Sequence, residues 1–166
     1  MLKLTKKADY GLIALKHLAE AAARDGRNSA VSAKDIADAY SIPQEAMAKI
    51  LQRLAKSGLL VSHHGTNGGY ALARAAKHIT AFEVIKAIDG PLFITSCSTH
   101  KGECVQSTKC NVKEPLKKVN DSIHAVLNKI TIADMQDPNG PGPGRNDNEP
   151  NESQHRAPLS NLVTLA

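Results

Sequence analysis

The sequence lacks the features of a membrane-spanning protein, a disulfide-bonded secreted protein or an enzyme of a common class. No apolar run approaches the roughly 18 residues needed to span a bilayer, and residues 1–7 lack the apolar segment of a signal peptide. The three cysteines are an odd number and do not indicate a disulfide framework. A nucleotide-binding loop, a nucleophile motif and a paired acidic site are also missing. We therefore expect a cytoplasmic protein that has no membrane partner and is not an enzyme.

The net positive charge of the 166-residue chain comes from its first part. Residues 1–90 contain 13 Lys and Arg against 8 Asp and Glu, whereas residues 91–166 contain 8 of each. The net charge of +5 therefore belongs to the first segment. A basic segment indicates a polyanionic partner such as nucleic acid, although an ordinary solvated surface would have the same composition.

Three helices are predicted in the first 57 residues. The first covers 5–23, the second covers 33–40, and the third covers 44–57 and is ended by Gly58. The third helix has an apolar stripe made of Met47, Ile50, Leu51 and Leu54. Its opposite face carries Glu45, Lys49, Gln52 and Lys56. Two short helices joined by a tight turn, the second with a polar and basic outer face, indicate a helix-turn-helix.

A β-hairpin is predicted directly after these helices. Strands over 59–62 and 70–73 are joined by a glycine-rich tip over 63–69. A helix-turn-helix followed by a hairpin is a winged helix, in which the second helix enters the major groove and the wing reaches phosphates or the minor groove. A plain surface hairpin is the alternative. The residues expected nearest to double-stranded DNA are Gln44, Glu45, Lys49, Gln52, His63, His64, Gly65 and Asn67.

A short helix and a long helix are predicted in the second half. Thr80 and Glu83 form a capping box for the short helix, which ends at residue 89. Asn111 would cap the long helix, with Pro115 tolerated in its first turn. Apolar residues recur along the long helix at heptad positions, namely Leu116, Val119, Ile123, Val126 and Ile130. This seam is typical of a helix that pairs with its twin in a homodimer, and packing back on its own domain is the alternative.

The fold class that these patterns predict is mainly α. We expect a winged helix-turn-helix domain over 1–90, a cysteine loop over 91–111 and a dimerisation helix over 112–136. Thr131 and Asp134 would start a last short turn at the end of the third segment. Residues 137–166 are rich in Pro, Gly and Asn and predict a disordered tail.

The three cysteines form the most distinctive chemical motif. Cys97, Cys104 and Cys110 are spaced as C-x6-C and C-x5-C, and the missing C-x2-C pair disfavours a zinc ribbon. Three soft thiolates suit an iron–sulfur cluster or another soft metal, with a fourth ligand from His100, His124, a carboxylate or the partner subunit. A thiol redox switch and inert cysteines are the alternatives.

Several of these motifs together resemble the Rrf2 family of bacterial repressors. They are Leu-Thr-Lys through Asp-Tyr at 4–10, Gly-Thr-Asn-Gly-Gly-Tyr at 65–70, the segment 79–90, and three spaced cysteines before a long helix. The resemblance covers about residues 1–136. It implies a homodimer formed through the long helix and a cluster in the cysteine loop whose state sets operator affinity. The implied cluster is [2Fe-2S], with [4Fe-4S] as the alternative.

The resemblance also implies roles for individual residues. Cys97, Cys104 and Cys110 match the three cluster cysteines, although the first gap is one residue longer than usual. The IscR-like branch has a histidine ligand where this chain has Lys113. The NsrR-like branch uses an aspartate from the first helix of the other subunit, which Asp9 matches, with His100 as the second candidate.

The DNA contacts of the family fall on Glu45, Ala46, Ala48 and Lys49 in the recognition helix and on His64 in the wing. IscR-like members carry a glutamate at the position of Ala48 and an arginine at that of His64, so the resemblance does not carry over the operator sequence of those members. The preferred function is a repressor of iron–sulfur assembly genes, because the N-terminus is similar to that of the SUF-operon regulators. A nitric-oxide sensor, a cluster-free thiol or zinc switch, and a protein-interaction module are the alternatives.

Overall fold

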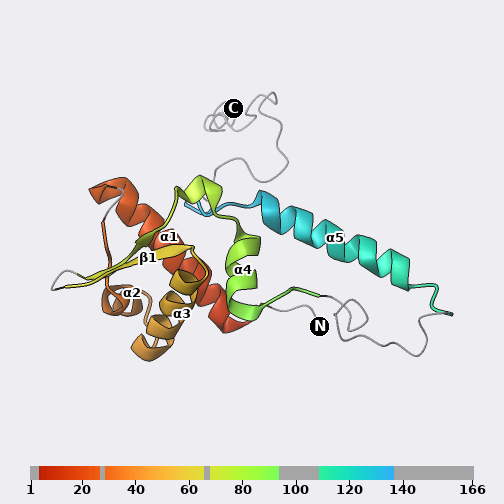
Figure 1. Ribbon diagram of the computed structural model, residues 1–166, viewed down its shortest axis with the longest axis horizontal. Coiled ribbons are helices and arrows are strands. Elements are labelled where there is room, and N and C mark those ends of the chain that lie inside the picture. Colours follow the sequence, from red (N-terminus) through yellow and green to blue (C-terminus); the bar gives the residue numbers. More distant parts are fainter. Residues whose placement is uncertain (1–3, 27–28, 66–67, 94–108, 137–166) are drawn as a thin grey trace, which may run out of the picture.

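The computed structural model describes residues 4–26, 29–65, 68–93 and 109–136 (Figure 1). Within these ranges the elements, in chain order, are α1 Lys6–Asp25, α2 Ala33–Ala39, α3 Gln44–Lys56, β1 Leu60–His63, β2 Gly69–Leu72, the 3-10 helix η1 Ala76–His78, α4 Ala81–Asp89 and α5 Lys113–Lys129. The mainly helical fold and its two-stranded wing are as predicted. Among the described helices, none combines the length and the apolar character needed to cross a membrane.

Side-chain caps set the starts of the first two helices. The Thr5 hydroxyl oxygen accepts from the Ala8 amide at 3.2 Å, and the Ser32 hydroxyl oxygen accepts from the Asp35 amide at 3.1 Å. Capping satisfies amides that the first turn of a helix leaves without an internal partner. α3 ends at Lys56, and Gly58 follows with a φ of +75°, which confirms its predicted role as the stop.

The capping box of α4 is also confirmed. The Thr80 hydroxyl accepts from the Glu83 amide, and the Glu83 carboxylate accepts from the Thr80 amide at 3.0 Å. Partial burial alone would raise the pKa of Glu83. The hydrogen bond from the Thr80 amide, and then the hydrogen bond and charge of Arg74, outweigh burial and hold the pKa of Glu83 below its ordinary value.

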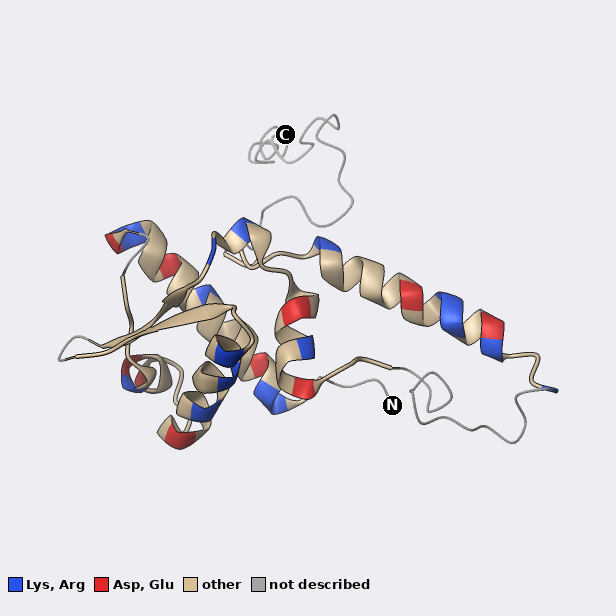
Figure 2. Ribbon diagram, viewed as in Figure 1, with Lys and Arg blue, Asp and Glu red and all other residues tan. Residues whose placement is uncertain are grey.

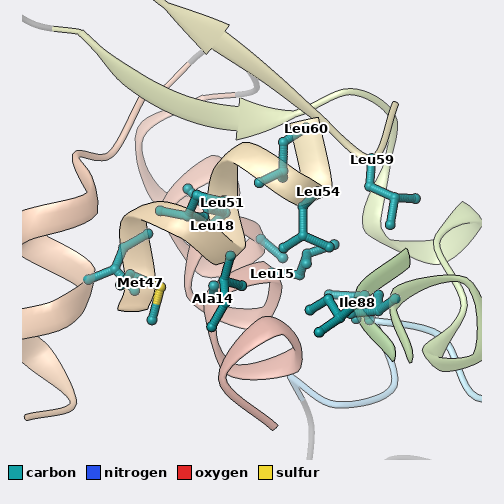
Figure 3. Packing of buried hydrophobic residues seen from close by; sticks show 14 of the residues in the cluster. Ala14, Leu15, Leu18, Met47, Leu51, Leu54, Leu59, Leu60 and Ile88 are labelled. Atoms are coloured by element: carbon teal, nitrogen blue, oxygen red, sulfur yellow. The ribbon is translucent and has the colours of Figure 1, made fainter. Parts of the chain in front are cut away.

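The core lies between α1, α3 and α4. The predicted stripe of α3 is buried in full, with Met47, Ile50, Leu51 and Leu54 at most 5% exposed. Figure 3 shows side chains of α3 lying against α1, with Ile88 of α4 beside them. The buried face of α1 is wider than the predicted apolar stripe, because it also includes Gly11 and Ala14. A Cβ at Gly11 would lie 2.2 Å from the end of the Ile88 side chain, so this glycine allows α1 and α4 to approach closely.

The wing is shifted by one residue from the predicted strands. β1 pairs antiparallel with β2 from Leu60↔Leu72 to His63↔Gly69. β1 starts one residue late because the Leu59 amide donates to the Leu54 carbonyl at 3.0 Å, in the turn that follows α3. β2 starts one residue early because Gly69 pairs with His63.

A third segment joins the wing, and no sequence pattern indicated it. Val31 and Tyr70 exchange two backbone hydrogen bonds, of 3.0 and 2.9 Å. A Cβ at Gly69 would lie 2.5 Å from the Val31 carbonyl oxygen, so only glycine fits beside this bridge. The wing is therefore attached to the chain just before α2.

α5 begins later and ends earlier than predicted. Val112, and not Asn111, stands at the N-cap, so Pro115 is the third helical residue. That position suits proline because the amide there has no partner within the helix, whereas a start one residue earlier would cost a hydrogen bond. Ile130 lies beyond the helix in extended conformation, and it is therefore not a helical heptad position.

The residues after α5 return to the winged helix. The Ala81 amide donates to the Ile130 carbonyl at 2.8 Å, and the Ile132 amide donates to the Ile79 carbonyl at 2.9 Å. Ile132 is fully buried in the same core as α1 and α3. The predicted turn at Thr131 is confirmed, since its hydroxyl accepts from the Asp134 amide at 3.2 Å. The predicted tail over 137–166 lies outside the described residues.

Candidate nucleic-acid interface

α3 presents its polar face to solvent, as a recognition helix must. Gln44, Glu45, Lys49 and Gln52 are exposed, and they lie opposite the buried stripe. Ala46 and Ala48 are half-buried. Figure 2 shows basic residues along α3 and at the start of α1. Pro43 stands at the N-cap, where its side chain cannot accept a hydrogen bond, so the first-turn amides are left for other acceptors.

The wing extends from the same part of the molecule. His63 and His64 are exposed, and Gly65 has a φ of +111°, which allows the tight turn after β1. Asn67 lies outside the described residues. The described part of the wing is therefore open to a ligand, and its DNA contacts stay a prediction.

Two contacts that the sequence did not suggest fix α3 and α1 to the end of α4. Arg53 of α3 donates from Nη1 to the carbonyl of Ile88 at 2.8 Å. The Thr5 hydroxyl, which caps α1, donates to the Asp89 carboxylate at 2.7 Å. Helical periodicity predicts which face of a helix is buried, but it does not predict which elements that helix contacts. The sequence therefore did not distinguish Arg53 from the other exposed cations. These bonds join the recognition helix and the start of α1 to the point from which the cysteine segment leaves.

The cysteine segment is described only at its edges. Cys97, His100 and Cys104 lie outside the described residues, whereas Cys110 is a half-buried free thiol shortly before α5. Asp9 is exposed in the first turn of α1. Figure 1 shows α5 beginning well away from the first turn of α1. In the described ranges no three potential ligands gather into a metal site.

His124, a candidate fourth ligand, is engaged elsewhere. Its Nε2 lies 2.8 Å from the carbonyl oxygen of Leu92, and its ring centroid lies 4.8 Å from that of Phe82. These contacts attach the middle of α5 to α4 and to the first residues of the cysteine segment. His124 thus positions that segment's start.

The heptad seam of α5 is largely open. Val119 and Val126 are 48% and 51% exposed, and Leu116 and Ile123 are half-buried. Val112 continues the same apolar surface one turn earlier, at 53% exposed. Exposed valines at heptad spacing are the surface that a second helix would cover. Dimerisation through Leu116, Val119, Ile123, Val126 and Ile130 stays a prediction.

An amphipathic helix with an exposed polar face, followed by a two-stranded wing, defines a winged-helix DNA-binding protein. The chain belongs to the Rrf2 family, described as iron-dependent transcriptional regulators, which its residues 4–138 match. This membership agrees with the prediction that the chain is not an enzyme.

Solved structures of this class resemble the chain over most of its length. T. potens IscR is 30% identical, with a TM-score of 0.62 over 81% of this chain and 85% of that one. CymR, the global cysteine regulator of B. subtilis, is 25% identical, with a TM-score of 0.65 over 82% and 97%. The oxidized form of Staphylococcus aureus CymR, at 22% identity and a TM-score of 0.62 over 82% and 97%, shares the fold.

Proposed function

We propose that the protein is a repressor that senses an iron–sulfur cluster and that the state of the cluster sets its operator affinity. The observation that carries this proposal is the position of the cysteine segment. It follows directly on α4, and Arg53 of the recognition helix α3 is hydrogen-bonded to the last turn of α4. A change in the cysteine segment therefore has a short physical route to the helix that reads DNA.

The donor set suits a cluster. Cys97, Cys104 and Cys110 would hold it, and when bound it supplies a centre that reacts with oxidants or nitric oxide. Lys113 is exposed at the start of α5 and, as a protonated amine, is a poor ligand. The fourth ligand is then Asp9 of the partner subunit or His100. The exposure of Asp9 supports the first choice, because another subunit can reach it.

The chain's own contacts supply the coupling. The Leu92 carbonyl is held by His124, the Asp89 carboxylate by Thr5, and the Ile88 carbonyl by Arg53. A segment that pulls on Leu92 shifts the end of α4, and the shift reaches α1 and α3 through these bonds. A coupling free energy of about 1–3 kcal/mol would change operator affinity by about 5–150-fold.

Two subunits joined along α5 would present two copies of α3 to half-sites about one turn of DNA apart. Genes of iron–sulfur cluster assembly are the preferred target, and genes of nitric-oxide defence are the second. A cluster-free thiol switch is the alternative function. It is supported by the likeness to CymR of B. subtilis, which is described as a global cysteine regulator.

The test is anaerobic native mass spectrometry of protein purified from iron-replete cells. The wild type should be a dimer that carries iron and sulfide. Cys104→Ala should lose both and remain a dimer, and Asp9→Ala should lose most of the iron, whereas Asp38→Ala, an exposed acid on α2, should keep it. A wild-type dimer at the bare polypeptide mass would overturn the cluster proposal in favour of the thiol switch.

A further inference from the structure

A hollow of about 650 Å³ lies beside α3, between its outer face, the start of α1 and the end of α4. Four cationic side chains line it, Lys7 of α1 and Lys49, Arg53 and Lys56 of α3. Glu45 is the one acid among its lining residues in the described part of the chain. All four cations are exposed. The hollow is thus a strongly positive and solvent-open surface.

Local structure explains why the cations gather there. Lys49, Arg53 and Lys56 are spaced at i, i+4 and i+7, so they form one stripe on α3. Lys7 joins them because the bond from Thr5 to Asp89 holds the first turn of α1 against the end of α4. The bond from Arg53 to the Ile88 carbonyl keeps the guanidinium at the hollow instead of free in solvent.

We infer that this hollow is a docking surface for the DNA backbone and that Lys7, Arg53 and Lys56 hold phosphates of the operator. The inference rests on DNA binding by α3 in the proposed function. The N-terminal half of a recognition helix lies nearest the bases, so its C-terminal half rises past the groove edge, where phosphates line the duplex. Arg53 and Lys56 lie on that C-terminal half, and Lys7 extends the positive surface onto α1.

The charge and exposure of the hollow favour the DNA backbone over a small anionic metabolite as its ligand. Ligand pockets for small molecules bury most of their occupant, whereas the cations here are exposed and spread over two helices. Duplex DNA presents about one negative charge per 1.7 Å of its axis, which suits several separated cations. Backbone contacts fix the register of the protein on DNA and are indifferent to sequence.

The test uses full-length Lys7→Gln and Lys56→Gln, with Lys16→Gln as the matched control. Lys16 lies on α1, pairs with Glu20 at 3.3 Å and is not part of the hollow. Fluorescence anisotropy would follow binding to a duplex enriched by the wild type and to a scrambled duplex, each over a range of salt concentrations. Thermal unfolding would confirm that the variants are folded.

We expect each hollow variant to weaken binding to both duplexes by a similar factor. The slope of log affinity against log salt should become shallower by about 1 per charge removed, or about 2 per dimer. Lys16→Gln should match the wild type. Unchanged slopes in both hollow variants would overturn the inference while leaving DNA binding by α3 intact. Wild type that enriches no duplex and does not bind the scrambled duplex would instead refute the proposed function, and tight binding of inorganic phosphate by that protein would show a small-anion site.

Discussion

Replacing Ile132 by Ala should destabilise the winged helix, although Ile132 follows the long helix α5. Its side chain is fully buried in the core formed by α1 and α3, and its amide donates to the Ile79 carbonyl. Truncating a fully buried isoleucine to alanine costs about 2–5 kcal/mol, through lost transfer free energy and the cavity that remains. The backbone hydrogen bond to Ile79 would survive the substitution, so the decrease in the free energy of unfolding would come from the side chain. Ile132→Val should cost only about 0.5–1.5 kcal/mol.

The assay is urea unfolding followed by the helical circular dichroism signal. All variants must be compared at one protein concentration, because association contributes to apparent stability. A single domain has a free energy of unfolding of about 5–15 kcal/mol, so Ile132→Ala should move the midpoint far to lower urea. Val61→Thr is the control, because that valine is 46% exposed on β1, away from α5, and its replacement by another β-branched residue should change the free energy of unfolding by no more than about 0.5 kcal/mol.

The order of the three variants in free energy of unfolding tests whether Ile132 packs into the core. If Ile132→Ala lowers the free energy of unfolding no more than Val61→Thr does, residues 130–132 do not pack into the core. The attachment of the residues after α5 to the winged helix would then be wrong.

Three further predictions concern the dimer, the capping box and the wing. Val126→Glu should turn the dimer into a helical monomer in analytical ultracentrifugation, whereas Lys117→Glu, on the opposite face of α5, should remain a dimer; a dimeric Val126→Glu would exclude this seam. Glu83→Gln should lower the free energy of unfolding by up to about 1 kcal/mol above pH 4.5, the ordinary pKa of Glu83. Because its pKa is lowered in the fold, this difference should vanish as the pH falls through that lowered pKa, and a pH-independent difference would contradict the pairing. Gly69→Ala should cost about 1–3 kcal/mol, because the new Cβ meets the Val31 carbonyl oxygen, and wild-type thermal stability in this variant would refute the close approach.

Local patterns made most of the fold predictable. The stripe of α3 follows from a 3.6-residue period, and the Thr80 capping box follows from two residue types at a defined spacing. The bridge between Val31 and Tyr70 and the burial of Ile132 were missed for one reason. Each is a pairing between distant segments made by one or two residues, so neither leaves a periodic signal.

The candidate site divides in the same way. The exposed face of α3 and the wing could be predicted, because amphipathic spacing and glycine-rich turns are local. The positions of Arg53 and Lys7 at the hollow could not be predicted. Arg53 is placed there by its hydrogen bond to α4, and Lys7 is placed there by the fold, which brings α1 beside α3. Of the candidate cluster ligands, Cys110, Asp9 and His124 lie within the described residues, and the Nε2 of His124 lies 2.8 Å from the Leu92 carbonyl oxygen.

The return of the chain at Ile130 has a topological consequence. Residues 91–129 follow the C-terminus of α4, and Ile130 directly after them pairs with the N-terminus of α4, so both ends of this segment are anchored on one helix. With nine residues at about 1.5 Å each, the two attachment points are about 13 Å apart. Both anchors of the segment are therefore supplied by the winged helix itself. The length and chemistry of the segment can differ without a change in the order of the DNA-binding elements, provided that the anchors and the contacts of His124 are kept.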